Sequence, residues 1–312
     1  TRYPFQGALY GLPPKVVKEC LIGAIEARFG SLKAGGSPKA NGRNCNTGAI
    51  TDCRADGILE SEAVLAPTGA QPRNFEEFIY QVLGAGIAKH FAIPYNRKLW
   101  TVPLSEMETS WLGGRVPLPD IGEMIEGALQ PVPKPMGPNA RFGYPLRGGF
   151  QALMDGFLPY LKGELRLNSK IAAVSLKGHT VTLAGGEQVK YEYLISTIPL
   201  PVLVRMAGEE APPAVRAAAP GLRHVSVRCV HLGIDRPNIT EKHWIYYPED
   251  TIFHRVFVQG NASPHCNPPG GFGLTCEITY SKYKPLPCDG DELIRRTVED
   301  CRRVGIIRRE DR

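Results

Sequence analysis

Near its start the chain places two aromatic residues around a proline, with a carboxamide beside them. Tyr3, Phe5 and Gln6 stand in the string Tyr3-Pro4-Phe5-Gln6. Two rings and an amide could form a stacking slot with a polar end, which suits a nucleobase. Taken alone, the string favours the simpler interpretation of core aromatics near a chain end.

A glycine pair followed by an arginine lies further along the chain. Gly113 and Gly114 allow the backbone to approach a ligand closely, and Arg115 follows them. The planar fork of an arginine matches the oxygens of a pyrophosphate. Upstream, Trp100 closes the string PYNRKLW at 94–100. The alternative interpretation of the glycine pair is a loop with a solvated arginine.

A third string combines aromatic residues with an arginine in the second half of the chain. Residue alternation puts Trp244 and Tyr246 on one face of an expected strand, and Arg255 begins another. Aromatic rings beside an arginine are a plausible surface for a sugar nucleotide. An amphipathic sheet with an aromatic outer face explains the same string equally well.

The overall composition excludes several classes of protein. The 312 residues are 43% hydrophobic and 22% charged, which is ordinary globular usage and excludes disorder and fibrous repeats. No apolar run reaches the roughly 18–20 residues that a membrane span needs. The net charge of +6 is scattered apart from arginines at 302, 303, 308 and 309, so no nucleic-acid partner is indicated. A mild basic excess suits an anionic small molecule.

The cysteines and histidines show no pattern typical of a metal site or a protein nucleophile. No two of the eight cysteines have C-x-x-C spacing, and the seven histidines are dispersed. We therefore expect no metal, and reduced cysteines in a cytoplasmic protein. No Ser-His-Asp or Cys-His arrangement indicates nucleophilic catalysis by the protein itself.

Apolar spacing predicts a helical first half. Helices are expected over 13–29, from Asn74 as N-cap, over 86–91 with a stop at Pro94, as a pair within 104–130, and over 150–161. Residues 31–73 are rich in Gly, Ser, Asn, Ala and Pro, which predicts a long loop or insertion.

From Glu164 onward the apolar period changes to two, which predicts strands. Two strands, a turn at Gly185-Gly186 and a buried strand over 193–197 are expected, followed by a helix from Pro199 to Met206. Further strands are expected over 223–233, 244–247, 253–259 and 272–280, and a helix over 292–303. The sequence therefore predicts a mixed α+β fold.

Several of these strings together resemble the UDP-galactopyranose mutases, the eukaryotic type more closely than the bacterial one. The matching blocks are YPFQ at 3–6, GIAKHFAIPYNRKLWTVP at 86–103, WLGGRVPLP at 111–119, GPNARFGYPLRGG at 137–149, YLISTIPL at 193–200 and WIYYPEDTIFHRV at 244–256. Their order and approximate spacing agree with the family over most of the chain apart from residues 31–73.

The resemblance implies an FAD-dependent, Rossmann-type and amine-oxidase-like architecture with a helical domain and an antiparallel-sheet substrate domain. Residues 1–6 would be a substrate strand, 7–135 the helical domain, 136–206 a returning part of the FAD domain, and 207–312 the sheet domain. The sequence contains no G-x-G-x-x-G, so FAD is implied by the resemblance alone and is expected to be bound mostly by residues outside this segment. The ends of the sequence suggest an internal portion of a longer protein.

The resemblance also implies roles for individual residues. Arg115 and Arg255 would clamp the diphosphate and are the catalytic candidates. The substrate-binding candidates are Tyr3, Phe5 and Gln6 at the uracil, Asn139 at the nucleotide sugar, and the aromatic residues Trp100, Trp244 and Tyr246. Ile171 and Thr197 would line the flavin.

The implied activity is the interconversion of UDP-galactopyranose and UDP-galactofuranose by a flavin-dependent isomerase, as in cell wall biosynthesis, with N5 of the reduced flavin as nucleophile. The implied partner is the UDP-galactose substrate, and a homo-oligomer is left open. Two alternatives are an FAD oxidoreductase similar to amine oxidases or protoporphyrinogen oxidase, and a non-catalytic remnant that binds sugar nucleotides.

Overall fold

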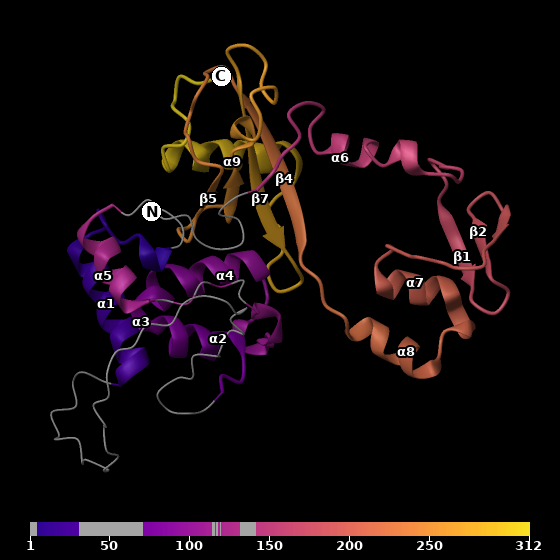
Figure 1. Ribbon diagram of the computed structural model, residues 1–312, viewed down its shortest axis with the longest axis horizontal. Coiled ribbons are helices and arrows are strands. Elements are labelled where there is room, and N and C mark those ends of the chain that lie inside the picture. The colour runs from indigo at the N-terminus through magenta and orange to yellow at the C-terminus, as the bar shows by residue number, and fades with distance from the viewer. Residues whose placement is uncertain (1–4, 31–70, 114–115, 117, 119, 132–141) are drawn as a thin grey trace, which may run out of the picture. The chain divides into compact units, whose positions relative to one another are not determined.

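The structure is a computed structural model that describes residues 5–113, 116, 118, 120–131 and 142–312, apart from residues 31–70 (Figure 1). By their contacts these residues form two compact units. The first unit combines residues 1–146 with 227–312, and the second consists of residues 147–226. Mixed helix and antiparallel sheet confirms the predicted fold class.

The helical part of the first unit is built on α1 (Pro14–Phe29), α2 (Phe75–Phe78), α3 (Gly84–Ile87), α4 (Ile93–Trp100) and α5 (Ile121–Leu129). Asn74 caps α2 as expected, because its Oδ1 accepts a hydrogen bond from the Glu77 backbone N–H at 2.9 Å. Short 3-10 turns cover Phe5–Gly7, Leu104–Glu106 and Ser110–Leu112. The expected strand over residues 1–6 is therefore wrong at its described end, because Phe5 begins a helical turn.

Pro94 does not end a helix, contrary to the prediction. π-Helical turns at Ile79–Leu83 and Ala88–Ala92 lie between α2, α3 and α4, and the backbone leaves helical geometry once, at Gly84, where φ is 84°. The second of these turns comes directly before Ile93, so Pro94 falls in the first turn of α4. The preceding turn has π-helical bonding, in which the Ile93 N–H donates to the Ala88 carbonyl five residues back, so the helical path continues past a residue that has no N–H.

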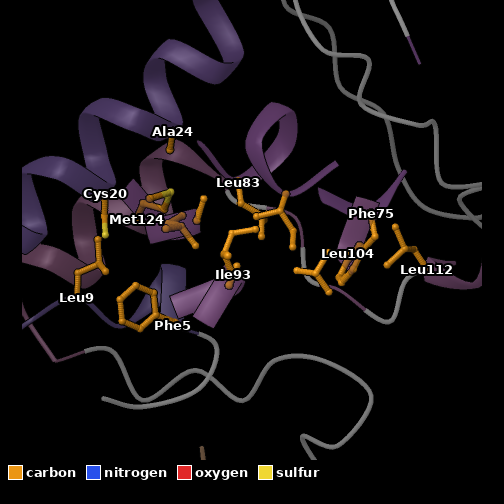
Figure 2. Packing of buried hydrophobic residues seen from close by; sticks show 14 residues of the cluster. Phe5, Leu9, Cys20, Ala24, Phe75, Leu83, Ile93, Leu104, Leu112 and Met124 are labelled. Carbon is orange, nitrogen blue, oxygen red and sulfur yellow. The ribbon is translucent and has the colours of Figure 1, made fainter. Parts of the chain in front are cut away.

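Glycines allow α1 and α3 to touch backbone to backbone. A Cβ added at Gly23 would lie 2.6 Å from the backbone nitrogen of Gly86, and one added at Gly86 would overlap the Glu19 carbonyl oxygen. Beside this crossing, the Glu19 carboxylate accepts hydrogen bonds from Lys89 Nζ and pairs with His90 Nε2, both at 2.7 Å. Figure 2 shows the buried side chains of the helical core, among them Phe75 of α2, Ile93 of α4 and Met124 of α5.

The sheet part of the first unit contains β4 (Ser226–Ile234), β5 (Trp244–Tyr246), β6 (Arg255–Phe257) and β7 (Phe272–Tyr280) in the order β4-β7-β6-β5. α9 (Gly290–Arg303) packs on one face, where Leu293 and Cys301 join a core with Val256, Leu274 and other strand residues. The period-two pattern of β7 predicts this packing, because the alternate residues Phe272, Leu274, Cys276 and Ile278 are apolar and buried.

The second unit contains α6 (Gln151–Asp155), the antiparallel sheet of β1 (Ile171–Ser175), β2 (Thr180–Leu183) and β3 (Gln188–Lys190), and the helices α7 (Leu200–Ala207) and α8 (Pro213–Ala218). The buried strand expected over 193–197 is wrong. Tyr193 and Ile195 are 87% and 94% exposed, and no strand of the described residues pairs with them. In the described part of the chain, no helix has the length and apolar content that crossing a membrane requires.

Candidate functional site

An aromatic row crosses from the helical part to the sheet of the first unit. It consists of Phe5, Phe91, Tyr95 and Tyr246. The Phe5 and Phe91 rings stack at 5.0 Å, and the Phe91 and Tyr95 rings stack at 5.3 Å. Tyr95 then meets Tyr246 edge-on at 5.3 Å. Phe91 and Tyr95 are four residues apart on the helical stretch that leads into α4, which puts them on the same face.

An arginine–glutamate pair lies at the sheet end of the aromatic row. Arg255 faces Tyr246 across β5 and β6, and Glu277 faces Arg255 across β6 and β7. Arg255 donates from Nε to Glu277 Oε1 at 3.1 Å and from Nη2 to Oε2 at 2.6 Å. The side chains are 30% and 17% exposed. Burial opposes the charge of Arg255, but the hydrogen bonds and charge of Glu277 raise its pKa.

A neutral histidine lies behind this pair. His254 is buried, and its ring lies 6.1 Å from that of Tyr95. Burial, together with the charges of Arg255, Lys98 and Lys284, lowers the pKa of His254 to about 3. Glu277 Oε2 lies 3.8 Å from Nε2, which is too far for a hydrogen bond, so the burial and the three cations dominate.

Trp244 lies on β5, the edge strand that also carries Tyr246, and it has two aromatic neighbours of its own. Its ring stacks on Phe257 across β5 and β6 at 5.2 Å and meets the edge of Phe142 at 4.9 Å. Because Trp244 and Tyr246 are two residues apart on one strand, both point to the same face. The structure thus presents Phe5, Tyr246, Arg255 and Trp244 on connected elements of one unit.

Trp100 belongs to a separate aromatic group. Its Nε1 donates to Asn96 Oδ1 at 3.1 Å, and its ring meets Trp111 at 5.1 Å. Trp111 in turn packs against Phe75 at the helical core. The group links α4 to the segment that leads toward Arg115.

The remaining predicted site residues divide into two sets. Tyr3, Arg115 and Asn139 lie outside the described residues, and of Gln6 only the backbone is described. Ile171 and Thr197 belong to the second unit, where Ile171 is half-buried opposite Leu183 and Thr197 is exposed. Their assignment to substrate and flavin stays a prediction.

Three residues at this site were missed by the sequence reasoning. Phe91 and Tyr95 carry a signal in their four-residue helical spacing. Glu277 carries one too, because it is an acidic residue inside an otherwise apolar and neutral strand, FGLTCEITY.

The helices and antiparallel sheets within the two units define a mixed α+β class of protein. The profile of the "Flavin containing amine oxidoreductase" family matches residues 100–305. The chain belongs to this flavin-containing amine oxidoreductase family.

Two solved structures are similar to this chain. A crystal structure of reduced UDP-galactopyranose mutase matches with a TM-score of 0.77 and 29% identity, covering 99% of this chain and 61% of that one. The chain thus spans about three fifths of the length of that mutase. A structure of a Pyrococcus furiosus protein matches with a TM-score of 0.53 and 12% identity, covering 75% of this chain and 55% of that one, which shows the fold alone.

Membership of this family implies a flavin cofactor. The two residues assigned to the flavin lie in the second unit, where Ile171 is half-buried and Thr197 is exposed, and neither forms a flavin site by itself. The sequence also lacks the glycine-rich turn that holds a dinucleotide pyrophosphate.

Proposed function

We propose that this chain is the substrate-binding part of a flavin-dependent isomerase that interconverts UDP-galactopyranose and UDP-galactofuranose. The 29% identity to a UDP-galactopyranose mutase over 99% of the chain supports this proposal. The observation that carries it is Arg255 facing Tyr246, with Trp244 on the same strand, since an arginine and aromatic side chains are groups that bind a diphosphate and a nucleotide sugar. The Phe5 and Tyr95 rings of the aromatic row are buried.

Each part of the site has a task that follows from its chemistry. Phe5, with Tyr3 and Gln6 beside it, would hold the uracil by stacking and hydrogen bonding. Arg255 and Arg115 would hold the diphosphate, which is the leaving group of the reaction. Trp100, Trp244 and Tyr246 would shield the sugar from water, and Asn139 would contact the nucleotide sugar. Holding the leaving group and excluding water are contributions that the protein itself can make to such a reaction.

Glu277 would orient Arg255 for this task. Within the described residues, the hydrogen bonds of the guanidinium run from Nε and Nη2 to Glu277. The Nη1 edge of the same rigid plane is then the one presented to a phosphate oxygen. A fork held by a carboxylate loses less conformational entropy when it binds a ligand.

A reduced flavin, when bound, would supply the nucleophile for the proposed reaction, which needs no net oxidation. The test is to reduce the flavin-loaded protein with dithionite, add UDP-galactofuranose, and follow UDP-galactopyranose by chromatography. We expect conversion by the reduced protein and none by the oxidised protein. Equal conversion by both forms would refute a reduced flavin as nucleophile.

The match to the amine oxidoreductase profile over residues 100–305 favours a second candidate, an FAD oxidoreductase that acts on amines. This candidate gives no reason for an arginine beside an aromatic row. It predicts oxygen consumption in proportion to an added amine and no conversion of UDP-galactofuranose, so the same preparation of protein distinguishes the two activities.

A further inference from the structure

Lys98 extends from α4 into the connection between β5 and β6. Its Nζ donates to the Tyr247 carbonyl at 2.9 Å, to the Glu249 carbonyl at 2.8 Å and to Thr251 Oγ1 at 2.8 Å. A lysine ammonium has three N–H donors. All three of its donors therefore have an acceptor, and every acceptor belongs to one short segment, residues 247–251.

This segment is a tight turn that exposes its oxygens to Lys98. The Tyr247 N–H donates to the His254 carbonyl at 2.9 Å, and the Thr251 N–H donates to the Glu249 carbonyl at 2.8 Å. Thr251 Oγ1 also donates to the Phe253 carbonyl at 2.6 Å. Removing the ammonium would take away the donor to the partly buried Tyr247 carbonyl, whereas the Glu249 carbonyl would keep the Thr251 N–H.

The C-terminal end of α4 is also bonded to β7 and the residue after it. Thr279 Oγ1 donates to the Lys98 carbonyl at 2.5 Å, and Ser281 Oγ donates to the Thr101 carbonyl at 2.7 Å. Thr101 ends α4 in the left-handed region, with φ at 55°. The last turn of α4 is thus joined by polar contacts both to the β5–β6 connection and to the end of β7.

The same face of α4 carries Tyr95, three residues before Lys98. Tyr95 meets Tyr246 at 5.3 Å, and Tyr246 is the neighbour of Tyr247, whose carbonyl Lys98 binds. Where Lys98 meets the turn therefore determines where Tyr95 meets Tyr246. Because Arg255 faces Tyr246 across β5 and β6, the same contact also places Tyr95 relative to Arg255.

The ammonium is held in an environment that disfavours its charge. Burial and the charge of Lys284 lower the pKa of Lys98 to about 8, while Glu249, Asp250 and Asp300 act in the opposite direction. His254 also lies near, and it is held neutral. An apolar side chain would avoid this cost of burial, so the lysine is better explained by the precise register that its three bonds impose.

We propose that Lys98 is a positioning residue, which joins α4 to the β5–β6 connection and thereby aligns Tyr95 with Tyr246 and Arg255 for ligand binding. The identity of the ligand, a uridine diphosphate, rests on the proposed function. The anchoring itself does not depend on it.

The experiment compares Lys98→Met with wild type and with Lys15→Met, which changes an exposed lysine on α1. UDP affinity is measured by calorimetry, and hydrogen exchange by mass spectrometry over residues 247–254. Lys98→Met should bind UDP at least tenfold more weakly and exchange this segment at least tenfold faster. Lys15→Met should match wild type within about twofold in both measurements.

Thr251→Val provides a second variant, which keeps the ammonium and removes one of its acceptors together with the hydrogen bond from Thr251 Oγ1 to the Phe253 carbonyl. It should weaken UDP binding about threefold, and it decides the proposal if Lys98→Met does not fold. The double variant Lys98→Met/Thr251→Val should bind UDP as weakly as Lys98→Met alone, because both changes break the same contact. If the two residues act independently, the losses of UDP affinity in the single variants should add.

Wild-type affinity and wild-type exchange in Lys98→Met would overturn the proposal, as would additive losses of affinity in the double variant. If wild-type protein itself does not bind UDP, the proposed function fails. Exchange over 247–254 then decides the anchoring alone: faster exchange in Lys98→Met upholds it, and unchanged exchange overturns it.

Discussion

His254 is expected to make the stability of the first unit depend on pH. Its side chain is only 2% exposed, and burial with the charges of Arg255, Lys98 and Lys284 lowers its pKa to about 3. In the unfolded chain a histidine has a pKa near 6.5. Between about pH 3 and pH 6.5, His254 therefore carries a proton in the unfolded chain but not in the folded protein.

The sign and size of the effect follow from this difference. Because the unfolded state binds more protons, the free energy of unfolding falls as the pH drops from about 6.5 toward 3, by up to about 1.4 kcal/mol per pH unit. From pH 7 to pH 4.5 the contribution of His254 is a loss of about 2–3 kcal/mol.

The assay is urea unfolding of wild type and His254→Gln at pH 7 and pH 4.5. Glutamine does not titrate, so the variant should lose about 2–3 kcal/mol less than wild type over this interval, whatever its stability at pH 7. Other acid-sensitive groups, such as Glu19, cancel in this comparison. An equal loss in both proteins would refute a buried, neutral His254.

Three further predictions concern packing and polar contacts. Gly86→Ala should destabilise the protein by about 1–3 kcal/mol or more in urea unfolding, because a Cβ has no room against α1, while Gly233→Ala should change it by less than about 0.5 kcal/mol. Asp120→Ala should cost about 1 kcal/mol in the same assay by removing the N-cap of α5, whose Oδ1 accepts the Glu123 N–H. Glu277→Gln should weaken UDP binding several-fold in calorimetry with little change in the far-UV spectrum, because it loosens Arg255 without removing it.

The sequence predicts best those elements whose signal is local. α1 and β7 follow from apolar periodicity, and the cap at Asn74 follows from its residue type and the acidic first turn behind it. Pro94 misleads because the π-helical turn that places it at the start of α4 leaves no recognisable pattern. The strand expected over 193–197 fails because burial depends on a neighbouring strand, which local spacing cannot supply.

The site shows the same limit. Residue alternation predicts that Trp244 and Tyr246 share a face, and the resemblance selects Arg255. Neither indicates that Glu277 holds Arg255, because that contact depends on the register of β6 and β7. The link from Phe5 to Tyr246 through Phe91 and Tyr95 requires the packing of helix against sheet, which no local pattern encodes.

Binding of the uridine diphosphate of a sugar nucleotide by this chain can be measured by titrating UDP against wild type, Arg115→Ala and Arg255→Ala. Charge-assisted bonds from arginine to phosphate contribute roughly 1.5–3 kcal/mol each. Each alanine variant should therefore bind UDP about 10–150-fold more weakly, and Arg255→Lys should recover only part of the loss because it keeps the charge without the fork. Dissociation constants within about twofold of wild type in both alanine variants would contradict the account.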